Sequence, residues 1–452
     1  MLITGLILQL ALAMEPIHQT LTAPMDVWDV TAQDLDEDGL LDLVAFYGER
    51  DGSKDKKGLY VYLARRDGKY PTKPSFTFPL NADTGNAFFT ERDGRRELVV
   101  STKTGATRYV YQKNAFAEAG RYAFVSLLPA HTRKPIFLRN VSHDLDGDGS
   151  DEWIIPVLGG FDIWGGEEKM AFLEGEIRSE SYWYGGLNIH HRIPRVYVFK
   201  RPGEKNQAIG FTSEDGAIFH YGANWEASHR HEITGDLEDQ WEARTELADV
   251  NDDGRPDLMT TTSKGTTNIE VHTRIYLADT DLGYADKPSF ELKSKGGLAI
   301  PYLVDLNNDE KLDLVVRSFP ITLRNIANYL LRKKISLKIE TYLFKNGGYA
   351  KKPSYSNYVT ADISEGREEI SFANGDFDGD GAKDVAVGAR SSSLSIFTHG
   401  KGGVIGSRAW KTINVHTFGI ARTADLDDSG TDDIVIFHPL GKYQKEIKEI
   451  RF

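Results

Sequence analysis

DLDEDGLLDL, residues 34–43, places four aspartates within nine positions and then continues into apolar residues. Carboxylates this close repel one another unless a cation lies between them. The segment recurs five times, as DLDGDGSDEW from 144, DVNDDGRPDL from 249, DLNNDEKLDL from 305, DFDGDGAKDV from 376 and DLDDSGTDDI from 425. All six copies have Asp at position 1, Asp or Asn at position 3 and an acid at position 9, and most have Asp at position 5 and Gly at position 6.

Oxygen ligands at this spacing suit a hard cation and match the first nine positions of a calcium-binding loop. In such a loop, Gly at position 6 permits the sharp turn, and position 7 contributes its backbone carbonyl. The pattern predicts about six Ca²⁺ sites, against the alternative of Asx-type turns that hold no metal. The predicted ligands are Asp34, Asp36, Asp38, Leu40 and Asp42 in loop one; Asp144, Asp146, Asp148 and Glu152 in loop two; Asp249, Asn251, Asp253 and Asp257 in loop three; Asp305, Asn307, Asp309 and Asp313 in loop four; Asp376, Asp378, Asp380 and Asp384 in loop five; and Asp425, Asp427, Ser429 and Asp433 in loop six.

Loops four and six are expected to bind most weakly, because Glu310 replaces the glycine in one and Ser429 replaces an acid in the other. The loops are not EF-hands, which need a bidentate Glu at position 12 inside a helix. The residues after each loop, such as DLVAF and DLVVR, are short β-branched runs typical of buried strands. Each loop is therefore predicted to join two strands of a β-hairpin. Position 12 is Ala45, Ile155, Thr260, Val316, Val387 and Ile436 in the six copies.

The negative charge of the chain is concentrated in these loops. The whole chain has 54 basic and 67 acidic residues and a net charge of −13. The six ten-residue loops hold 27 of the acids and 3 of the bases, so the remainder carries a net charge of +11. The acidity therefore belongs to the predicted metal sites. No basic stripe interleaved with aromatic residues indicates nucleic-acid binding, and we expect no nucleic-acid partner.

The first residues, MLITGLILQLALA, combine an apolar stretch from 2 to 12 with an Ala-x-Ala that ends at Ala13. Residues 1–13 resemble a secretory signal peptide that lacks the usual basic residue near its start, and the alternative is a buried N-terminal strand. The stretch is too short to span a bilayer, and we expect no transmembrane segment elsewhere. Because the chain has no cysteine, calcium would have to stabilise it outside the cell in place of disulfides. The expected location is extracytoplasmic: secreted, periplasmic or at the cell surface.

The acidic loops recur at a regular period once two degenerate copies are included. Intact copies begin at 34, 144, 249, 305, 376 and 425, and the first two gaps are about twice the expected period. FTERDGRREL from 89 keeps acids at positions 3, 5 and 9, whereas VFKRPGEKNQ from 198 keeps only Gly203 at position 6. We expect neither degenerate copy to bind calcium. The chain then contains eight units of about 55 residues.

Each unit is predicted to contain four strands. VYLARRDGKYPTKPSFTF from 61, IYLADTDLGYADKPSFEL from 275 and TYLFKNGGYAKKPSYSNY from 341 share a strand, a Gly-Tyr turn, Lys-Pro-Ser and an aromatic strand. A strand, an acidic loop and three further strands at this period are typical of a propeller blade. We predict an all-β propeller of eight four-stranded antiparallel blades, or alternatively seven, forming one domain over residues 14–452. The last unit lacks its outer strand, which PIHQTLTA from 16 is expected to supply, closing the ring.

The Asp-rich loop followed by a short apolar strand resembles the FG-GAP/VCBS repeat family (integrin-alpha-like repeats) over residues 25–452. The resemblance implies a calcium-stabilised β-propeller, usually outside the cytoplasm, that acts mostly in binding. Because the family also includes carbohydrate-active enzymes, the resemblance does not decide a function. The chain has no Gly-x-Ser-x-Gly, phosphate-binding loop or His-Glu-x-x-His motif. We favour a monomeric binding or scaffold protein for a protein or glycan partner over a polysaccharide lyase or glycoside hydrolase built on the same propeller.

Three features outside the loops are further candidates. His229 and His231 alternate on one predicted strand as zinc ligands do, although solvent-facing histidines are the favoured interpretation. Tyr182, Trp183 and Tyr184 in SESYWYGG, and Trp164 in FDIWGG, could stack on sugar rings or anchor a protein partner, although packing between blades is favoured. Residues 321–338 are expected to form a helical insertion that caps its own blade, or alternatively docks on a partner or an anionic surface.

We predict that partners bind on the face opposite the acidic loops, because strand direction places the long connections there. Antiparallel strands alternate, so the connections after the second and fourth strands of each unit emerge on that face. The long segments predicted there are YGERDGSKDKKG from 47, GGFDIWGGEE from 159, GGLNIHHR from 185 and residues 321–338. Long loops on a rigid scaffold commonly carry binding sites. The predicted partner-binding residues are Trp164, His190, His191, Arg192, Lys333 and Lys334.

Overall fold

The computed structural model of the chain describes residues 16–48, 56–102, 104–128, 134–183, 187–213, 216–232, 242–265, 269–362, 370–400, 404–406, 408–417, 419–439 and 443–452. The predicted leader at residues 1–13 and most of the YGERDGSKDKKG segment lie outside these ranges. Within the described ranges, no helix is both long enough and apolar enough to cross a membrane.

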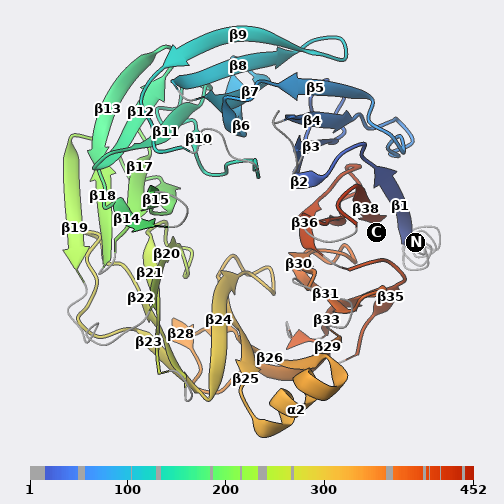
Figure 1. The fold of residues 1–452 in the computed structure, drawn as a ribbon. Helices are drawn as coiled ribbons and strands as arrows, with labels where there is room; N and C mark the ends of the chain where they lie inside the picture. Colours follow the sequence, from blue (N-terminus) through green and yellow to red (C-terminus); the bar gives the residue numbers. More distant parts are fainter. Residues whose placement is uncertain are drawn as a thin grey trace, which may run out of the picture.

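Eight four-stranded antiparallel sheets are arranged in a ring, which confirms the eight-bladed prediction over the seven-bladed alternative (Figure 1). The first strand of a blade lies toward the centre of the ring, and the fourth lies at the rim (Figure 1). In blades one to eight, the first strands are β2 (Val27–Gln33), β6 (Thr84–Arg92), β10 (Ser142–His143), β16 (Val196–Phe199), β20 (Glu242–Ala248), β24 (Gly297–Val304), β30 (Phe372–Gly375) and β36 (Ile420–Ala424).

The other three strands of each blade follow in sequence order except in blade eight. The second strands are β3 (Asp42–Gly48), β7 (Arg95–Thr102), β11 (Glu152–Val157), β17 (Ala208–Thr212), β21 (Asp257–Lys264), β25 (Asp313–Pro320), β31 (Asp384–Arg390) and β37 (Asp433–Phe437). The third strands are β4 (Lys57–Tyr62), β8 (Gly105–Tyr111), β12 (Gly160–Gly165), β18 (Gly216–Tyr221), β22 (Glu270–Tyr276), β26 (Lys334–Tyr342), β32 (Ser393–Phe397) and β38 (Glu446–Arg451). The fourth strands are β5 (Phe76–Leu80), β9 (Phe116–Ala123), β13 (Glu168–Glu174), β19 (Ala227–Glu232), β23 (Phe290–Lys295), β29 (Tyr355–Asp362), β35 (Lys411–Ile413) and β1 (Ile17–Thr22).

The two ends of the chain close the ring. β1 pairs antiparallel with β38, with Ile17 opposite Arg451 at one end and Thr22 opposite Glu446 at the other. The N-terminal segment thus supplies the outer strand of blade eight, as PIHQTLTA was predicted to do. Closure in this way leaves β38 hydrogen-bonded to a neighbouring strand on both sides.

The hydrophobic core is divided among the junctions between blades. Eight clusters of buried apolar side chains occur, one at each junction between consecutive blades. At the closing junction, Leu21 of β1 lies in one cluster with Leu43 of blade one and Phe437 of blade eight, and all three are fully buried. The predicted β-branched runs after the loops form buried second strands, such as β3 and β37. Because each blade buries its faces against its neighbours, the ring packs as one body.

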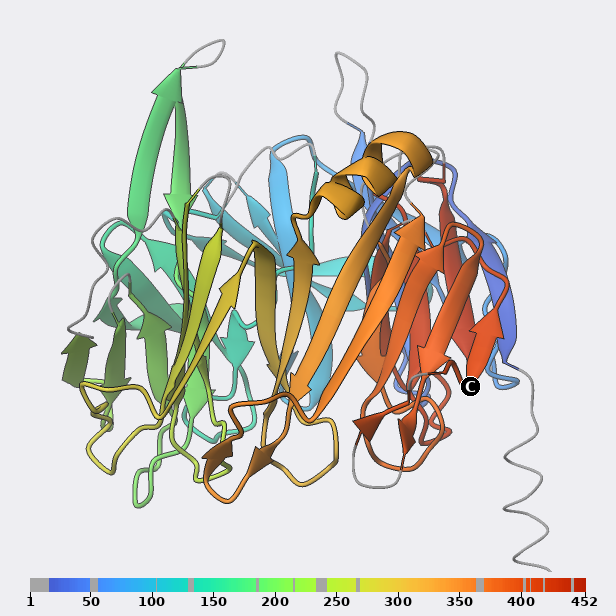
Figure 2. The ribbon, with the colours of Figure 1, turned by 90° about the horizontal axis from the view of Figure 1, so that it is seen from below.

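The connections between strands divide between two faces as strand direction predicts. Loops one to six join first and second strands on one face, which we call the loop face. The hairpins β27 (Phe344–Lys345) to β28 (Gly348–Tyr349) and β33 (His399–Gly400) to β34 (Val404–Ile405) lie on the same face. The helix α2 (Leu323–Arg332) and the hairpin of β14 (Arg178–Trp183) and β15 (Leu187–Arg192) rise from the opposite face, which we call the insertion face (Figure 2).

Two predicted insertions differ from the structure. The helix covers Leu323–Arg332 and not 321–338, because Lys333 adopts a left-handed conformation with φ of 53° and β26 begins directly after it. The GGFDIWGGEE segment is not a long loop. Val157 pairs with Gly160, so a two-residue turn leads straight from β11 into β12 and most of the segment is strand.

Candidate functional site

The six acidic loops share one backbone conformation. Positions 4 and 6 have positive φ in every copy, between 56° and 91°. Glycine adopts this region without strain, and Asn and Asp adopt it more readily than other residues. Position 4 is accordingly Gly, Asp or Asn in five copies and Glu37 in the first. Position 6 is Gly except at Glu310, where a φ of 66° marks backbone strain in loop four.

The aspartate at position 1 organises each turn. In all six loops its carboxylate accepts hydrogen bonds from the backbone N–H groups of positions 5 and 6. In loop five, Asp376 accepts from Asp380 over 3.1 Å and from Gly381 over 2.8 Å. The side chain at position 5 accepts from the N–H of position 7. Bonds of this kind form in metal-free Asx turns too, so they do not by themselves indicate a metal.

The acid at position 9 is the buried member of each loop. Its carboxylate accepts from the N–H of position 2 in every loop, and in five loops also from an N–H that follows the third strand. Burial raises its pKa well above the ordinary value, because the loss of hydration of the ionised form outweighs these hydrogen bonds. The pKa is raised to about 7 at Asp42, Glu152, Asp257 and Asp433 and to about 6 at Asp313, and it is also raised at Asp384.

Four of the loops bring three carboxylates close enough to share one ion. One oxygen of Asp146 and one of Asp427 are buried without a hydrogen-bond partner among the described residues. Clustered, partly buried oxygen donors suit Ca²⁺, which would supply the missing positive charge. The predicted ligands of these loops therefore fit a calcium ion. Ligand oxygens lie within 4.8 Å of one another in the sets Asp34, Asp36 and Asp38; Asp144, Asp146 and Glu152; Asp376, Asp378 and Asp384; and Asp425, Asp427 and Asp433.

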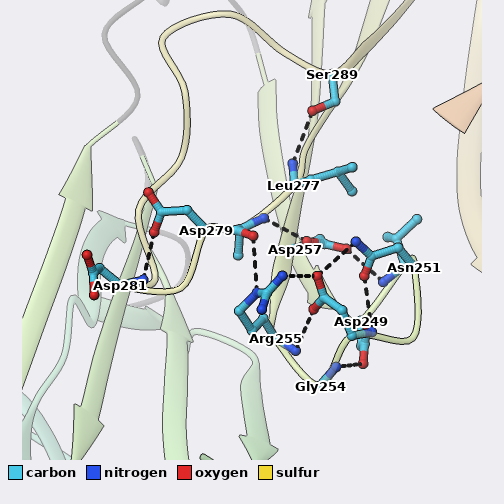
Figure 3. Close-up of polar contacts among 12 residues, drawn as sticks. Asp249, Asn251, Gly254, Arg255, Asp257, Leu277, Asp279, Asp281 and Ser289 are labelled. Atoms are coloured by element: carbon cyan, nitrogen blue, oxygen red, sulfur yellow. Dashed lines mark hydrogen bonds and ion pairs between the residues drawn. The ribbon is translucent and has the colours of Figure 1, made fainter. Parts of the chain in front are cut away.

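Loops three and four differ because Asn stands at position 3. In loop three, the Asn251 side chain donates to Asp253 over 2.9 Å, and the Arg255 guanidinium donates to the same carboxylate. Figure 3 shows Asn251 and Arg255 gathered with the other labelled loop residues. Loop four repeats the amide contact, from Asn307 to Asp309 over 3.2 Å. An amide N–H in both loops, and a guanidinium in loop three, therefore lie against the carboxylate at position 5. Loop six also has a basic side chain nearby, since a guanidinium nitrogen of Arg451 lies 3.6 Å from a carboxylate oxygen of Asp427.

Blades two and four replace the acidic loop in different ways. In blade two a tight turn at Asp93 and Gly94 joins β6 to β7, and the acid at position 9, Glu97, lies 2.6 Å from a guanidinium nitrogen of Arg108. In blade four, position 9 is Asn206, a buried amide that donates to the Ala223 carbonyl over 2.6 Å. Blade two thus pairs its acid at position 9 with a guanidinium, and blade four has a neutral amide there, whereas the other six blades have a buried carboxylate with a raised pKa. These contacts support the prediction that neither copy binds calcium.

Five of the six predicted partner-binding residues lie on the insertion face. His190, His191 and Arg192 belong to β15, where the Arg192 guanidinium lies 3.1 Å from a carboxylate oxygen of Glu180. Lys333 and Lys334 follow α2. The structure thus brings the basic residues of the hairpin and of the helix to one face (Figure 2).

The sixth predicted residue, Trp164, lies elsewhere. It pairs with Trp153 of β11, which directly follows loop two, and so lies toward the loop face. Its ring packs on Phe124 with the ring centroids 5.3 Å apart, between blades two and three. Placing it on the insertion face was wrong, because the short β11–β12 turn puts it late in a strand rather than in a loop. The favoured interpretation of packing between blades holds for Trp164, whereas Tyr182 and Trp183 are exposed.

The two alternating histidines do share a strand, β19, at the rim. His231 packs edge-on against the Tyr284 ring, with centroids 4.9 Å apart. Among the described residues, no group of three metal-ligating side chains includes His229 or His231. The structure therefore favours a packing role for His231 over zinc binding.

A pocket of about 790 Å³ lies between blades four, five and six on the insertion face. Arg244 and Leu298, which line it, stand near the starts of β20 and β24, whose other ends lead into acidic loops. Half-exposed Leu298 and Ile300 form an apolar wall. Five arginines and two glutamates give the lining a net charge of +3, in a chain of net charge −13. These charged residues are Arg178, Arg192, Arg195, Arg244, Arg317, Glu176 and Glu246.

Besides Arg192, whose contact with Glu180 is described above, Arg195 and Arg317 are held by specific contacts. A guanidinium nitrogen of Arg195 lies 3.3 Å from a carboxylate oxygen of Glu246. The Arg317 guanidinium stacks on the rings of Tyr302 and Phe372, 5.0 Å and 4.5 Å from their centroids, and its Nε is buried without an acceptor among the described residues. Sequence reasoning identified only Arg192 of this lining. The pocket combines fixed positive charge with an apolar wall, which suits an acidic ligand.

The comparisons with known proteins concern the repeat and the fold. Residues 249–316, which contain loops three and four, match the family model of the FG-GAP-like repeat. Among curated proteins, no sequence matches the chain. Solved structures with a similar fold include the V. cholerae biofilm matrix protein Bap1, at 11% identity and a TM-score of 0.41 over 95% of this chain and 88% of that chain. Others are BBS1N, solved in complex with ARL6DN, at 10% identity and 0.40 over 97% and 96%, and the rhamnogalacturonan lyase YesW, at 10% and 0.29 over 93% and 60%.

Likeness at these identities and scores carries no argument about function. The match over 249–316 agrees with the resemblance that the acidic loops indicated. The chain is an eight-bladed β-propeller with an FG-GAP-like repeat at residues 249–316.

Proposed function

We propose that this propeller is a binding protein for an acidic glycan, stabilised by calcium in the loops of its opposite face. The arginine-rich pocket on the insertion face is the observation that carries the proposal. Arginine stays charged at physiological pH and binds a carboxylate through two parallel N–H groups. The apolar wall at Leu298 and Ile300 offers a surface for the C–H faces of sugar rings.

The size of the pocket favours a glycan over a folded protein partner. A volume of about 790 Å³ is in the range of clefts that enclose small ligands. A stable protein complex instead needs a broad surface on each partner. A uronate-containing oligosaccharide supplies both carboxylates for the arginines and apolar ring faces for the wall.

Calcium is structural in this proposal. The loop ligands named above lie on the loop face, whereas the pocket opens on the insertion face. A bound ion would neutralise the clustered carboxylates of a loop. Because the acid at position 9 also accepts an N–H from beyond the third strand, the ion would stabilise three strands of the blade together.

Calorimetric binding of an oligosaccharide panel to the calcium-loaded protein tests the proposal. We expect uronate oligosaccharides to bind and neutral oligosaccharides of the same length not to bind measurably. Arg195→Ala should weaken uronate binding about tenfold, because a charge-assisted hydrogen bond contributes about 1.5–3 kcal/mol. Arg121→Ala is the matched control: the Arg121 side chain is 75% exposed, against 73% for Arg195, and also pairs with a glutamate, but lies on the outer strand β9.

Two outcomes would overturn the glycan site. One is equal affinity for neutral and acidic oligosaccharides, and the other is unchanged uronate affinity in Arg195→Ala. Release of shortened or unsaturated sugars in the same assay would instead favour the alternative, a polysaccharide lyase or glycoside hydrolase on the same propeller.

We also propose that the leader at residues 1–13 is removed and that the mature chain, a single monomeric domain from residue 14, acts outside the cytoplasm. Millimolar extracellular calcium would fill weak sites such as loops four and six. N-terminal sequencing of the native protein should find a start near Met14. Retention of Met1 would contradict export through this leader.

A further inference from the structure

The helix α2 turns its apolar side chains toward solvent and buries a polar one. A surface helix normally turns its apolar stripe toward the protein core. In α2 the buried residue is Asn325, whose side chain donates to the Pro320 carbonyl over 2.8 Å. The large apolar side chains are 42–87% exposed; they are Leu323, Ile326, Tyr329, Leu330 and Leu331. At 3.6 residues per turn, these five and exposed Ala327 form one continuous arc of about 200° around the helix.

The sequence around this apolar arc is strongly basic. No acidic residue occurs between 321 and 338. Exposed bases flank the arc at both ends of the helix: Arg324, Arg332, Lys333 and Lys334. A helix with an exposed apolar arc and basic residues beside it has the composition of helices that lie in the interface of a bilayer. Anionic headgroups would complement this charge.

A second apolar element rises from the same face. The β14–β15 hairpin carries Trp183, which is 81% exposed, and half-exposed Tyr182 and Ile189. Trp and Tyr are the side chains that favour the membrane–water interface. The hairpin and α2 stand apart around the ring (Figure 1) and project in the same direction (Figure 2). One extended surface can therefore contact both elements at once.

We infer that the insertion face docks on the surface of an anionic lipid bilayer through α2, with the β14–β15 hairpin as a second contact. Leu323, Leu330 and Leu331 enter the boundary between headgroups and acyl chains. Arg324, Arg332, Lys333 and Lys334 contact lipid phosphates. A bilayer fits the observations better than a protein groove, because the apolar arc is convex, covers more than half of the helix and is bordered by four basic residues, with no acid between 321 and 338.

Co-sedimentation with lipid vesicles tests the inference on the full calcium-loaded protein. We expect binding to vesicles of equal phosphatidylcholine and phosphatidylglycerol, and little binding to phosphatidylcholine alone. The triple variant Leu323→Ser/Leu330→Ser/Leu331→Ser should bind anionic vesicles at least about tenfold more weakly. Arg324→Gln/Arg332→Gln should lose affinity for anionic vesicles and reduce the dependence of binding on salt.

Phe172→Ser/Tyr358→Ser is the matched control, because these side chains are 50% and 60% exposed on the outer strands β13 and β29 at the rim. This variant should bind vesicles like the wild type, and all variants should keep the wild-type melting temperature and uronate affinity. Unchanged vesicle binding in the leucine variant, or no binding by the wild type, would overturn the inference. A wild-type dimer that the leucine variant dissolves, measured by light scattering, would also overturn it, since a second copy would then cover the helix.

Discussion

In five blades, the acid at position 9 joins three parts of the blade through one carboxylate. In loop five, Asp384 accepts the N–H of Phe377 within the loop over 3.1 Å and that of His399 beyond the third strand over 3.3 Å. Oxygens of Asp376 and Asp378 lie within 4.8 Å of the same carboxylate. Because this residue is buried, hydrogen-bonded and surrounded by like charges, we expect the stability of the blade to depend on pH and on a bound cation.

Asp376→Asn should weaken calcium binding at loop five by at least about tenfold, because a neutral amide oxygen replaces a carboxylate. Calorimetry should count one tight site fewer, and the melting temperature in calcium should fall. Asp93→Asn is the control, since it removes the same charge from the blade-two turn, where a φ of 51° suits Asn. An unchanged calcium stoichiometry in Asp376→Asn would contradict the assignment of loop five.

Calcium-free protein should lose stability as the pH rises from about 4 to about 7. In the folded chain, burial raises the pKa of Asp42, Glu152, Asp257 and Asp433 to about 7, whereas unfolded carboxyls titrate near about pH 4. The stability from these groups is therefore complete below about pH 4 and is lost as the pH passes through about 7. Calcium should remove this loss, because the ion competes with protons for the same oxygens.

Melting curves of dialysed protein, with and without added calcium, measure both effects. The stabilisation by calcium should grow across this pH interval. A calcium-free melting temperature that rises with pH would show that the loop carboxyls do not control stability.

At the scale of the element, blade two pairs its buried acid at position 9 with a guanidinium. Glu97 and Arg108 face each other across β7 and β8 with side chains that are 7% and 13% exposed. Arg108→Met keeps the aliphatic stem but leaves a buried carboxylate unpaired, which should destabilise the protein by about 3 kcal/mol. The loss should be the same with and without calcium. The double variant Glu97→Gln/Arg108→Met should recover much of it, because no charge is then buried.

Urea unfolding of these variants in calcium and in chelator checks the prediction. A destabilisation by Arg108→Met that disappears when calcium is removed would mean that blade two also responds to the ion.

An element could be predicted from the sequence when the residues that determine it lie close together in the chain. Each acidic loop and the strand after it are specified within about twelve consecutive residues, and loop geometry and burial follow from them. Trp164 was misplaced because a two-residue turn and a longer loop have similar composition when both are rich in glycine. The end of α2 was missed because Lys333, which has no turn-forming chemistry, takes the left-handed conformation at the C-cap. The arginine pocket had no local signal, since its lining residues lie between 176 and 317 and are gathered only by the ring.

At the scale of the whole molecule, the two faces differ in charge and in the role that we propose for each. The loop face holds the acidic loops, which contain 27 of the 67 acidic residues and carry a net charge of −24. The insertion face holds the arginine-rich pocket, the basic helix and the exposed aromatic hairpin. The ring between them lets one face present basic groups without neutralisation by the acidic loops of the other, since exposed charges further apart than about 10 Å are screened by salt.

Closure by β1 is expected to decide whether the ring unfolds as one unit. β1 is the strand that joins the two ends of the chain, and Leu21 lies fully buried at the junction of blades eight and one. Removing residues before 24 would expose the edge of β38 and the cluster around Leu21, so blade eight should open first and the protein should aggregate.

Leu21→Ala should lower the free energy of unfolding by about 3 kcal/mol. Ile17→Ser, at a side chain that is 52% exposed on the same strand, should change it little. Limited proteolysis and scanning calorimetry check the outcome: a truncated protein that stays monomeric and melts at the wild-type temperature would mean that the ring does not depend on its closing strand.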